Sequence, residues 1–174
     1  MRSDADLVRD ARAGHEEAFE QIVRRHQGVV RATSVRLCGD RSRGDDIAQS
    51  TFVTAWRRLG TYAGGSLRSW LCAIAYREFL QAKRRQRDEV EFHEADHVVV
   101  FDSSAARWAD EMDLVRALAD LPDDQRICVT LCVAAGLSHG EVSSLTDMPL
   151  GTVKSHVSRG VAALRLALTS ENVA

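Results

Sequence analysis

The sequence predicts an all-α protein made of two small helical domains joined by an acidic linker. Apolar residues recur at spacings of three and four along almost every segment, which is the period of an amphipathic helix. No run of alternating apolar and polar residues indicates a strand. The stretch 88–106 is acidic and lacks helical periodicity, so we place one domain at 1–87 and the other at 107–174.

The N-terminal domain is expected to hold four helices. Asp4 or Asp6 caps a first helix that ends near Gly14. A second helix covers about 15–38, and after a loop at 39–42 a third covers 45–59. Three glycines within 60–65 exclude a regular element there, and Ser66 caps a fourth helix that ends in the basic run 83–87. The inward positions of the second helix are Phe19, Ile22, Val23, Val29, Val30 and Leu37.

The C-terminal domain is expected to hold helices at about 107–120, 123–135, 138–145 and 150–168. Gly136 can end one of them in the left-handed conformation. Ser138 caps the next, and Glu141 three residues later completes a capping box. Pro149 disfavours helix at the residue before it, which makes 146–149 a turn. The last helix carries a buried stripe of Val153, Val157, Val161, Leu164 and Leu168.

Composition limits the classes of protein to which the chain can belong. The net charge of −2 argues weakly against nucleic-acid binding, but residues 1–90 carry +5 and residues 91–120 carry −6. The chain has no apolar run of membrane-spanning length and no signal core, so we expect a cytoplasmic protein without membrane insertion. The histidines and cysteines form no ligand set, so no metal or other cofactor is expected. Cys38, Cys72, Cys128 and Cys132 are interpreted as small buried hydrophobes.

The segments 138–145 and 150–159, with the turn between them, have the pattern of a helix-turn-helix. Short hydroxyls and long cations on the exposed side of its second helix suit base edges and phosphates in a major groove. The alternative is an ordinary amphipathic helical hairpin with a solvated polar face, and the bare pattern does not decide between the two. The candidate DNA-binding residues of this motif are Ser138, Thr152, Lys154, Ser155, His156, Ser158 and Arg159.

Three motifs are more specific than the pattern: 121–126 (LPDDQR), 136–138 (GLS) and 149–155 (PLGTVKS). They resemble the fourth-region signature of sigma-70-type transcription initiation factors, particularly the small extracytoplasmic-function group. The resemblance covers nearly the whole chain. It implies a sigma-2 domain at 1–87 and a sigma-4 domain at 107–174, with residues 138–159 reading the minus-35 element. The implied partners are bacterial core RNA polymerase, promoter DNA and an anti-sigma factor.

The segment 43–58 (RGDDIAQSTFVTAWRR) resembles the polymerase-binding helix of that family. In the family this helix docks on a coiled coil of the largest catalytic subunit, while a plain amphipathic helix remains the alternative. Ile47, Val53 and Trp56 can belong either to the domain core or to that interface. Ser50 stands where the family usually has a glutamate. The resemblance implies polymerase contacts at Asp45, Asp46, Gln49, Phe52 and Trp56.

The glycine loop and the helix after it resemble the promoter-melting segment. Such a loop can capture an unstacked base by stacking and edge hydrogen bonds, and the flexibility of Gly64 and Gly65 suits a pocket. Two positions that are basic in the family hold Ala73 and Tyr76 here, so we expect an unusual minus-10 element. Trp70 is in register with the apolar stripe and is assigned to the core. The implied minus-10 contacts are Thr61, Tyr62, Arg68, Tyr76, Arg77, Lys83 and Arg84.

The recognition helix departs from the family as well. His156 stands where arginine is common, and Gly160 with Val161 replaces an alanine–arginine pair. The loss of two cations predicts weaker phosphate contacts and a smaller salt dependence for this domain. In the interior of a helix, Gly160 also costs about 1 kcal/mol relative to alanine.

Two other function classes fit the sequence less well. A stand-alone transcriptional regulator with this helix-turn-helix is disfavoured, because the N-terminal half lacks the strand–helix alternation of a receiver domain. An enzyme is disfavoured because the chain has no nucleophile–base pair or metal-ligand set, and no Walker motif follows Gly64 and Gly65. The sequence therefore predicts a promoter-specificity subunit without a catalytic site of its own.

Overall fold

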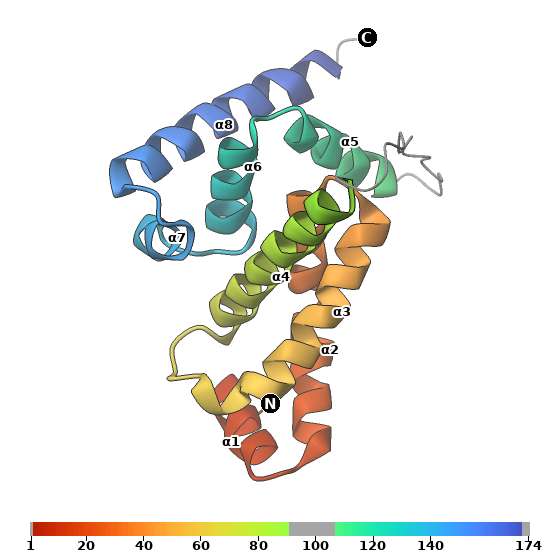
Figure 1. Cartoon of the computed structure of the whole chain (residues 1–174), viewed down its shortest axis with the longest axis vertical. Helices are drawn as coiled ribbons and strands as arrows, with labels where there is room; N and C mark the ends of the chain where they lie inside the picture. The colour runs from red at the N-terminus through yellow and green to blue at the C-terminus, as the bar shows by residue number, and fades with distance from the viewer. Residues whose placement is uncertain (1, 91–106, 172–174) are drawn as a thin grey trace.

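The computed structural model describes residues 2–90 and 107–171, and every regular element within these ranges is a helix (Figure 1). The expectation of an all-α fold is therefore confirmed. Among the described residues, no helix combines the length and the apolar character needed to cross a membrane. Most of the predicted linker lies outside the described residues, while 88–90 continue the preceding helix.

The N-terminal part is a bundle of four helices, α1 (Asp4–Arg12), α2 (Glu16–Cys38), α3 (Arg41–Arg58) and α4 (Leu67–Val90). A 3₁₀ turn, η1 (Leu59–Thr61), follows α3 directly, so the expectation that 60–65 holds no regular element is wrong at its first two residues. Helix α2 packs against each of the other three, as Figure 1 shows in the lower half of the molecule. The core of the bundle takes Leu7 from α1, Ile22 and Val30 from α2, and Leu67 and Leu71 from α4.

Two helix starts differ from the sequence prediction. The N-cap of α1 is Ser3 and not Asp4 or Asp6, because the Ser3 hydroxyl accepts from Asp6 N at 3.2 Å. The Asp6 carboxylate accepts in return from Ser3 N at 3.3 Å, which completes a capping box. Helix α3 begins four residues early, because the Asp40 carboxylate accepts from Arg43 N at 2.7 Å. The predicted loop 39–42 thus shrinks to Gly39, in the left-handed conformation at φ 66°, and the cap.

The C-terminal part consists of α5 (Arg107–Ala119), α6 (Asp123–Val129), α7 (His139–Thr146) and α8 (Leu150–Glu171). Helix α6 continues as a π-helical turn, η2 (Thr130–Ala134), where one uninterrupted helix was expected. The left-handed Gly136, at φ 82°, and the capping box of Ser138 with Glu141 are both confirmed. Along α8, Val153 and Leu164 are buried, and Val157, Val161 and Leu168 are partly buried, so the predicted stripe is confirmed.

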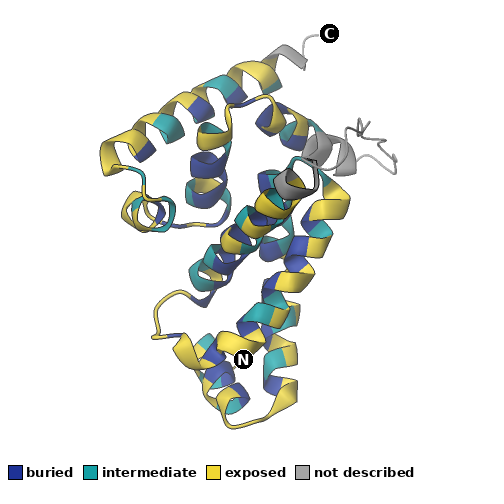
Figure 2. Ribbon diagram, in the orientation of Figure 1, coloured by how far each residue is buried: buried dark blue, intermediate teal, exposed yellow. Residues whose placement is uncertain are grey.

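The two parts are packed against each other through one apolar cluster. Figure 2 shows buried positions on α4 and on α6, which both contribute side chains to this cluster, and α2 packs against η2, α5 and α6 across the same contact. Two polar contacts support it, one from Arg68 to the carbonyl of Ala134 and one between Lys83 and Asp123. We call this packing of the N-terminal part against the C-terminal part the closed arrangement. From the N-terminal part the cluster takes Leu37, Ile47, Cys72, Tyr76 and Phe79, and from the C-terminal part Ile127, Cys128, Leu131, Ala135, Leu137, Val142 and Val153.

The four cysteines are free thiols in or beside this packed interior. Burial raises the pKa of Cys38 and of Cys128 to about 11, so both stay protonated at neutral pH. The Cys128 thiol lies 3.8 Å from the Met148 sulfur. Their surroundings are those of small buried side chains and not of reactive thiolates.

Two glycines allow helices to approach closely. A Cβ at Gly160 would lie 2.6 Å from Cγ2 of Val129, so this glycine lets α8 pack directly on α6. A Cβ at Gly44 would lie 2.6 Å from Cα and 2.7 Å from N of Val35, which are backbone atoms of α2. The propensity cost assigned to Gly160 from the sequence is therefore offset by a packing role that only the fold reveals.

We predict opposite effects for two matched glycine substitutions. Gly44→Ala forces α3 away from α2 and should lower the free energy of unfolding by about 2 kcal/mol, the usual cost of overpacking. Gly28→Ala, within α2 where an added Cβ meets nothing within 4 Å, should raise it by up to about 1 kcal/mol. Chemical denaturation followed by circular dichroism measures both. Equal changes for the two variants would contradict the close approach of α2 and α3.

Candidate nucleic-acid interface

The helix-turn-helix consists of α7, a turn through Asp147 at φ 59°, and α8. Val142 and Val153, both fully buried, fix the two helices to α6 and η2. The opposite side of α8 faces solvent and carries the short hydroxyls and cations that the sequence singled out. The exposed members of the predicted set are Ser138, Thr152, Lys154, Ser155, Ser158 and Arg159.

Two of the predicted DNA-binding residues also have local structural roles. The Ser138 hydroxyl is the N-cap of α7, and Ser138 N donates to the Glu141 carboxylate at 2.7 Å. His156 is only partly exposed, and its Nδ1 is buried without a hydrogen-bond partner. One edge of the imidazole therefore faces protein, so any contact to a ligand involves the other edge.

The predicted partner-binding helix, α3, has one buried side and one exposed side. Ile47 is buried, which assigns it to the core, whereas Val53 and Trp56 are 47% and 40% exposed. Asp46 and Gln49 are exposed on the same side as these two apolar residues. The outer face of α3, defined as Asp46, Gln49, Val53 and Trp56, is thus an apolar surface with polar neighbours.

The remaining predicted residues of α3 are engaged within the bundle. Phe52 is half-buried against the N-terminal core. Asp45 accepts two hydrogen bonds from the Arg31 guanidinium, at 2.5 and 3.0 Å. These bonds lower the pKa of the Asp45 carboxyl, so it is an anion with a partner of its own.

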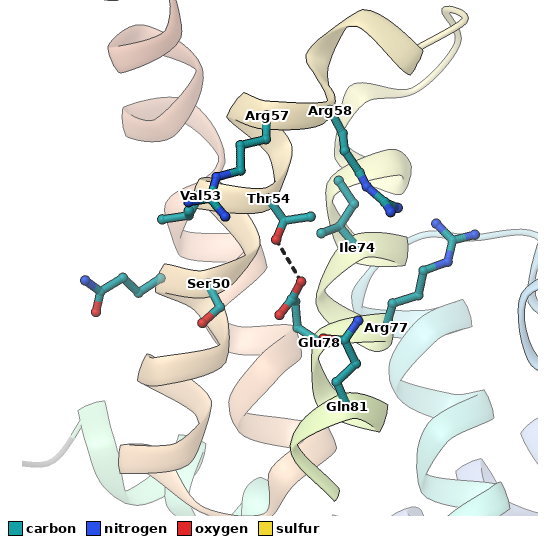
Figure 3. Close-up of a pocket in the computed structure, with 10 residues that line it drawn as sticks. Ser50, Val53, Thr54, Arg57, Arg58, Ile74, Arg77, Glu78 and Gln81 are labelled. Atoms are coloured by element: carbon teal, nitrogen blue, oxygen red, sulfur yellow. Dashed lines mark hydrogen bonds between the residues drawn. The ribbon is translucent and has the colours of Figure 1, made fainter. Parts of the chain in front are cut away.

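A polar pocket of about 530 Å³ lies between α3 and α4 (Figure 3). Arg57, Arg58 and Arg77 line it with exposed guanidinium groups. On its floor, Thr54 donates a hydrogen bond to the Glu78 carboxylate at 2.8 Å. Of these three arginines only Arg77 was predicted from the sequence, although the pair Arg57 and Arg58 just before the glycine loop is typical of a cationic site.

The glycine loop is more ordered than its composition suggested. Tyr62 is buried, its hydroxyl donates to the Gly65 carbonyl at 2.6 Å, and its ring meets Trp70 edge-on at 5.5 Å between centroids. Thr61 donates to the carbonyl of Arg58 at 2.8 Å. Gly64 and Gly65 adopt φ values of +102° and +85°, which few other residues tolerate. Tyr62 therefore supports the loop from inside, and residues 63–66 form its exposed surface.

The closed arrangement covers part of the predicted minus-10 surface on α4. Tyr76 is only 4% exposed and packs in the shared cluster near Phe79. Arg68 is bonded to the backbone of η2, and Lys83 pairs with Asp123, whose pKa this hydrogen bond lowers. Arg77 and Arg84 remain exposed. The closed arrangement thus leaves the helix-turn-helix face free, buries Tyr76, and engages Arg68 and Lys83 in polar contacts while they stay accessible to solvent.

Comparisons with known proteins bear on both parts of the chain. The family described as Sigma-70 region 2 matches residues 22–89, and the family described as Sigma-70, region 4 matches residues 111–164. The RNA polymerase sigma-H factor of Pseudomonas aeruginosa is 30% identical, in an alignment that covers 97% of this chain and 95% of that protein. The ECF RNA polymerase sigma-E factor of Escherichia coli is 30% identical over 90% of both chains.

Two solved structures are similar over most of the chain. The sigma factor RpoE from Bartonella quintana, in complex with the anti-sigma factor NepR, matches with a TM-score of 0.76 at 27% identity. The match covers 87% of this chain and 96% of that one. CnrH, in complex with the cytosolic domain of CnrY, matches with a TM-score of 0.66 at 26% identity over 96% of this chain and 97% of that one.

We predict that Tyr76→Arg opens the closed arrangement. A guanidinium at this buried site would lose its hydration without a built partner, which the apolar cluster cannot offset. The variant should show a larger radius of gyration in small-angle X-ray scattering than the unchanged chain. Tyr76→Phe, which keeps the ring, is the matched control and should stay compact. An unchanged radius for Tyr76→Arg would mean that this cluster does not hold the two parts together.

Proposed function

Since this chain belongs to the extracytoplasmic-function group of the sigma-70 family, we propose that three of its surfaces divide the steps of promoter-specific initiation among them. It is an RNA polymerase sigma factor, a subunit without enzymatic activity that directs polymerase to promoters. The observation that carries the proposal is the exposed polar face of α8, held in a helix-turn-helix whose apolar side is buried against the rest of the C-terminal part.

The minus-35 element is read by α8 in the major groove. Thr152, Ser155 and Ser158 offer short hydroxyls to base edges, and Lys154 with Arg159 supplies cations. Ser138 sits at the N-terminus of α7, where an N-cap lies close to a phosphate in this docking geometry. His156 completes the set through the ring edge that does not face protein. The boundaries 1–87 and 107–174 are proposed for the two domains.

Core polymerase binds the outer face of α3. Trp56 and Val53 supply apolar area that is exposed in the free chain, and Asp46 and Gln49 supply polar contacts beside it. Aromatic side chains of this kind dominate the binding energy of many interfaces. Phe52 and Asp45 support this face indirectly. Phe52 packs α3 against the core, and Asp45 accepts a hydrogen bond from Arg31.

The minus-10 element is melted at the loop 60–66 and along α4. Exposed loop atoms capture an unstacked base, with Thr61 and Tyr62 fixing the shape of the loop. Arg77 and Arg84 then follow the phosphates of the separated strand. Arg57 and Arg58, which line the same pocket as Arg77, extend this cationic path toward the loop.

The closed arrangement must open for this work, because it covers Tyr76 and engages Arg68 and Lys83. Separate binding of both parts to polymerase compensates for the lost contact, since tethering raises the effective concentration of each DNA-binding surface. One similar solved structure holds CnrH with the cytosolic domain of CnrY, and another holds a sigma factor with a protein named as an anti-sigma factor. We propose that a protein of that kind also binds this chain.

The assignment is tested by reconstituted transcription with sigma-free core polymerase and a library of genomic fragments. Discrete transcripts that require this chain are expected, and their aligned start sites define the two promoter elements. If the chain binds core polymerase but initiates from no fragment, the proposed DNA-binding surfaces are wrong.

We predict distinct effects for the two cations of α8. Lys154→Ala should weaken binding to all promoter variants alike and reduce the salt slope of binding by about one unit, because it removes a phosphate contact. Arg159→Ala should cost about 1–3 kcal/mol at one base position and relax selectivity there. Binding of the holoenzyme to a set of minus-35 variants at several salt concentrations measures both. Uniform losses for Arg159→Ala would contradict its role in base reading.

We predict that Val53→Glu weakens binding to core polymerase roughly tenfold, or about 1.4 kcal/mol. The new carboxylate would sit in the apolar part of the interface, while Val53 contributes little to the core of the free chain. Val133→Glu is the matched control, since Val133 is 63% exposed on the C-terminal part and away from α3. Titration of labelled core polymerase measures the affinity. Equal losses for both variants would show that the outer face of α3 is not the specific contact.

A further inference from the structure

Arg12, the last residue of α1, binds the turn from which the glycine loop starts. Its Nε and Nη2 donate to the Leu59 carbonyl at 3.0 and 2.9 Å, and Nη2 also reaches the Gly60 carbonyl at 3.4 Å. The same Nη2 donates to the carbonyl of Tyr62. One guanidinium thus joins three carbonyls that lie 47 to 50 residues away in the sequence.

Two of these carbonyls, those of Leu59 and Gly60, lie at a helix end, where backbone donors are few, and the Leu59 carbonyl also accepts from Tyr62 N at 3.2 Å. Leu59 and Gly60 form the 3₁₀ turn that closes α3, and the last carbonyls of a helix have no intrahelical donor. A planar guanidinium can satisfy several of them at once because its donors are arranged as a fork. Arg12 therefore acts as the cap of this helix end, supplied from a different helix.

The position of Arg12 is itself fixed by the core beneath the loop. Leu7, Val8 and Ala11 of α1 are buried in the same cluster as Leu59 and Tyr62. Helix α1 and the start of the loop are therefore joined by packing as well as by hydrogen bonds, and Arg12 lies at the edge of that contact.

The other end of the loop is fastened independently. The Tyr62 hydroxyl holds the Gly65 carbonyl, and the Ser66 hydroxyl accepts from Ser69 N at 3.1 Å, where α4 begins. Between the two ends, residues 63–65 are exposed, and an added Cβ at Gly64 or Gly65 meets nothing within 4 Å. The loop is thus a short exposed tip between two anchored ends.

We infer that Arg12 is a positioning residue for promoter melting, which holds the loop 60–66 in the shape that captures an unstacked base. The inference rests on the melting role proposed above for this loop. A loop that is ordered before the base arrives avoids the entropic cost of ordering at that moment, so capture is tighter. Arg12 acts through the Leu59, Gly60 and Tyr62 carbonyls and does not itself contact DNA.

Two simpler roles must be separated from this one. If Arg12 only stabilises the fold, its loss should weaken polymerase binding and lower the unfolding temperature together with base capture. If Arg12 only attracts DNA by its charge, any nearby cation on α1 should serve as well. Arg9 is the matched control, because it carries the same charge on the same helix and pairs with Asp6 and Asp10 at 3.0 and 3.1 Å, away from the loop.

The test uses the reconstituted holoenzyme and a promoter found in the transcription assay. Arg12→Gln, Arg12→Lys, Arg9→Gln and Ala63→Glu are compared for binding of core polymerase, for binding of a single-stranded non-template minus-10 oligonucleotide against a scrambled one, and for permanganate-reactive thymines in duplex promoter. Ala63→Glu places a carboxylate on the exposed tip and should block capture directly. Thermal unfolding of each free variant is recorded alongside.

We expect Arg12→Gln to weaken specific oligonucleotide binding roughly fivefold or more and to reduce open complexes, with polymerase binding and the unfolding temperature nearly unchanged. Arg12→Lys should regain part of the loss, because an ammonium reaches one carbonyl but cannot form the fork. Arg9→Gln should behave as the unchanged chain.

Three outcomes overturn the inference and differ in what else they imply. If Ala63→Glu abolishes capture while Arg12→Gln does not weaken it, Arg12 has no positioning role and the proposed function of the loop stands. If neither variant alters capture, the loop does not bind the base and the proposed melting surface fails as well. If Arg12→Gln lowers polymerase binding and the unfolding temperature in proportion to capture, its role is structural alone.

Discussion

Helix α4 buries apolar side chains on two faces, and the arrangement of the rest of the molecule depends on this. One face sends Leu71 and Ile74 into the core of the N-terminal bundle. The other sends Tyr76 and Phe79 into the cluster that also holds η2 and α7. A helix with apolar residues on both faces needs two partners, and the C-terminal part supplies the second one.

Tyr76 makes this second face possible. The resemblance to sigma-70 factors places a basic residue at this position, and an arginine buried to the same extent would carry a large desolvation cost. Tyr76 therefore has two consequences. It removes a cation from the predicted DNA-binding surface, and it allows the apolar packing of the closed arrangement. The polar contacts at its rim, such as Lys83 with Asp123, are half-exposed and contribute little, so the apolar cluster carries most of the stability.

Much of the fold followed from local sequence patterns, because helices are specified by short-range periodicity and caps. The capping box of Ser138 and the stripe through Val153 are examples in which neighbours in sequence decide the structure. The predicted cap of α1, Asp4 or Asp6, was wrong, because Ser3 just before them takes the N-cap position and pairs with Asp6. Two features could not be predicted from the sequence, because they depend on contacts between distant parts of the chain. They are the close approach of helices at Gly160 and the hydrogen bonds from Arg12 to backbone carbonyls, which leave no pattern in residue types.

The central claim is that the chain is closed when free and open when bound to polymerase, which exposes the whole minus-10 surface of α4. The most direct measurement is single-molecule energy transfer between dyes at Gln27 on α2 and Ala167 on α8, both exposed positions outside the proposed binding surfaces. One short-distance population in the free chain, replaced by a longer distance on core polymerase, is the result that the structure predicts. A short distance that persists in an active open complex would contradict the claim, as would a free chain that shows only the long distance.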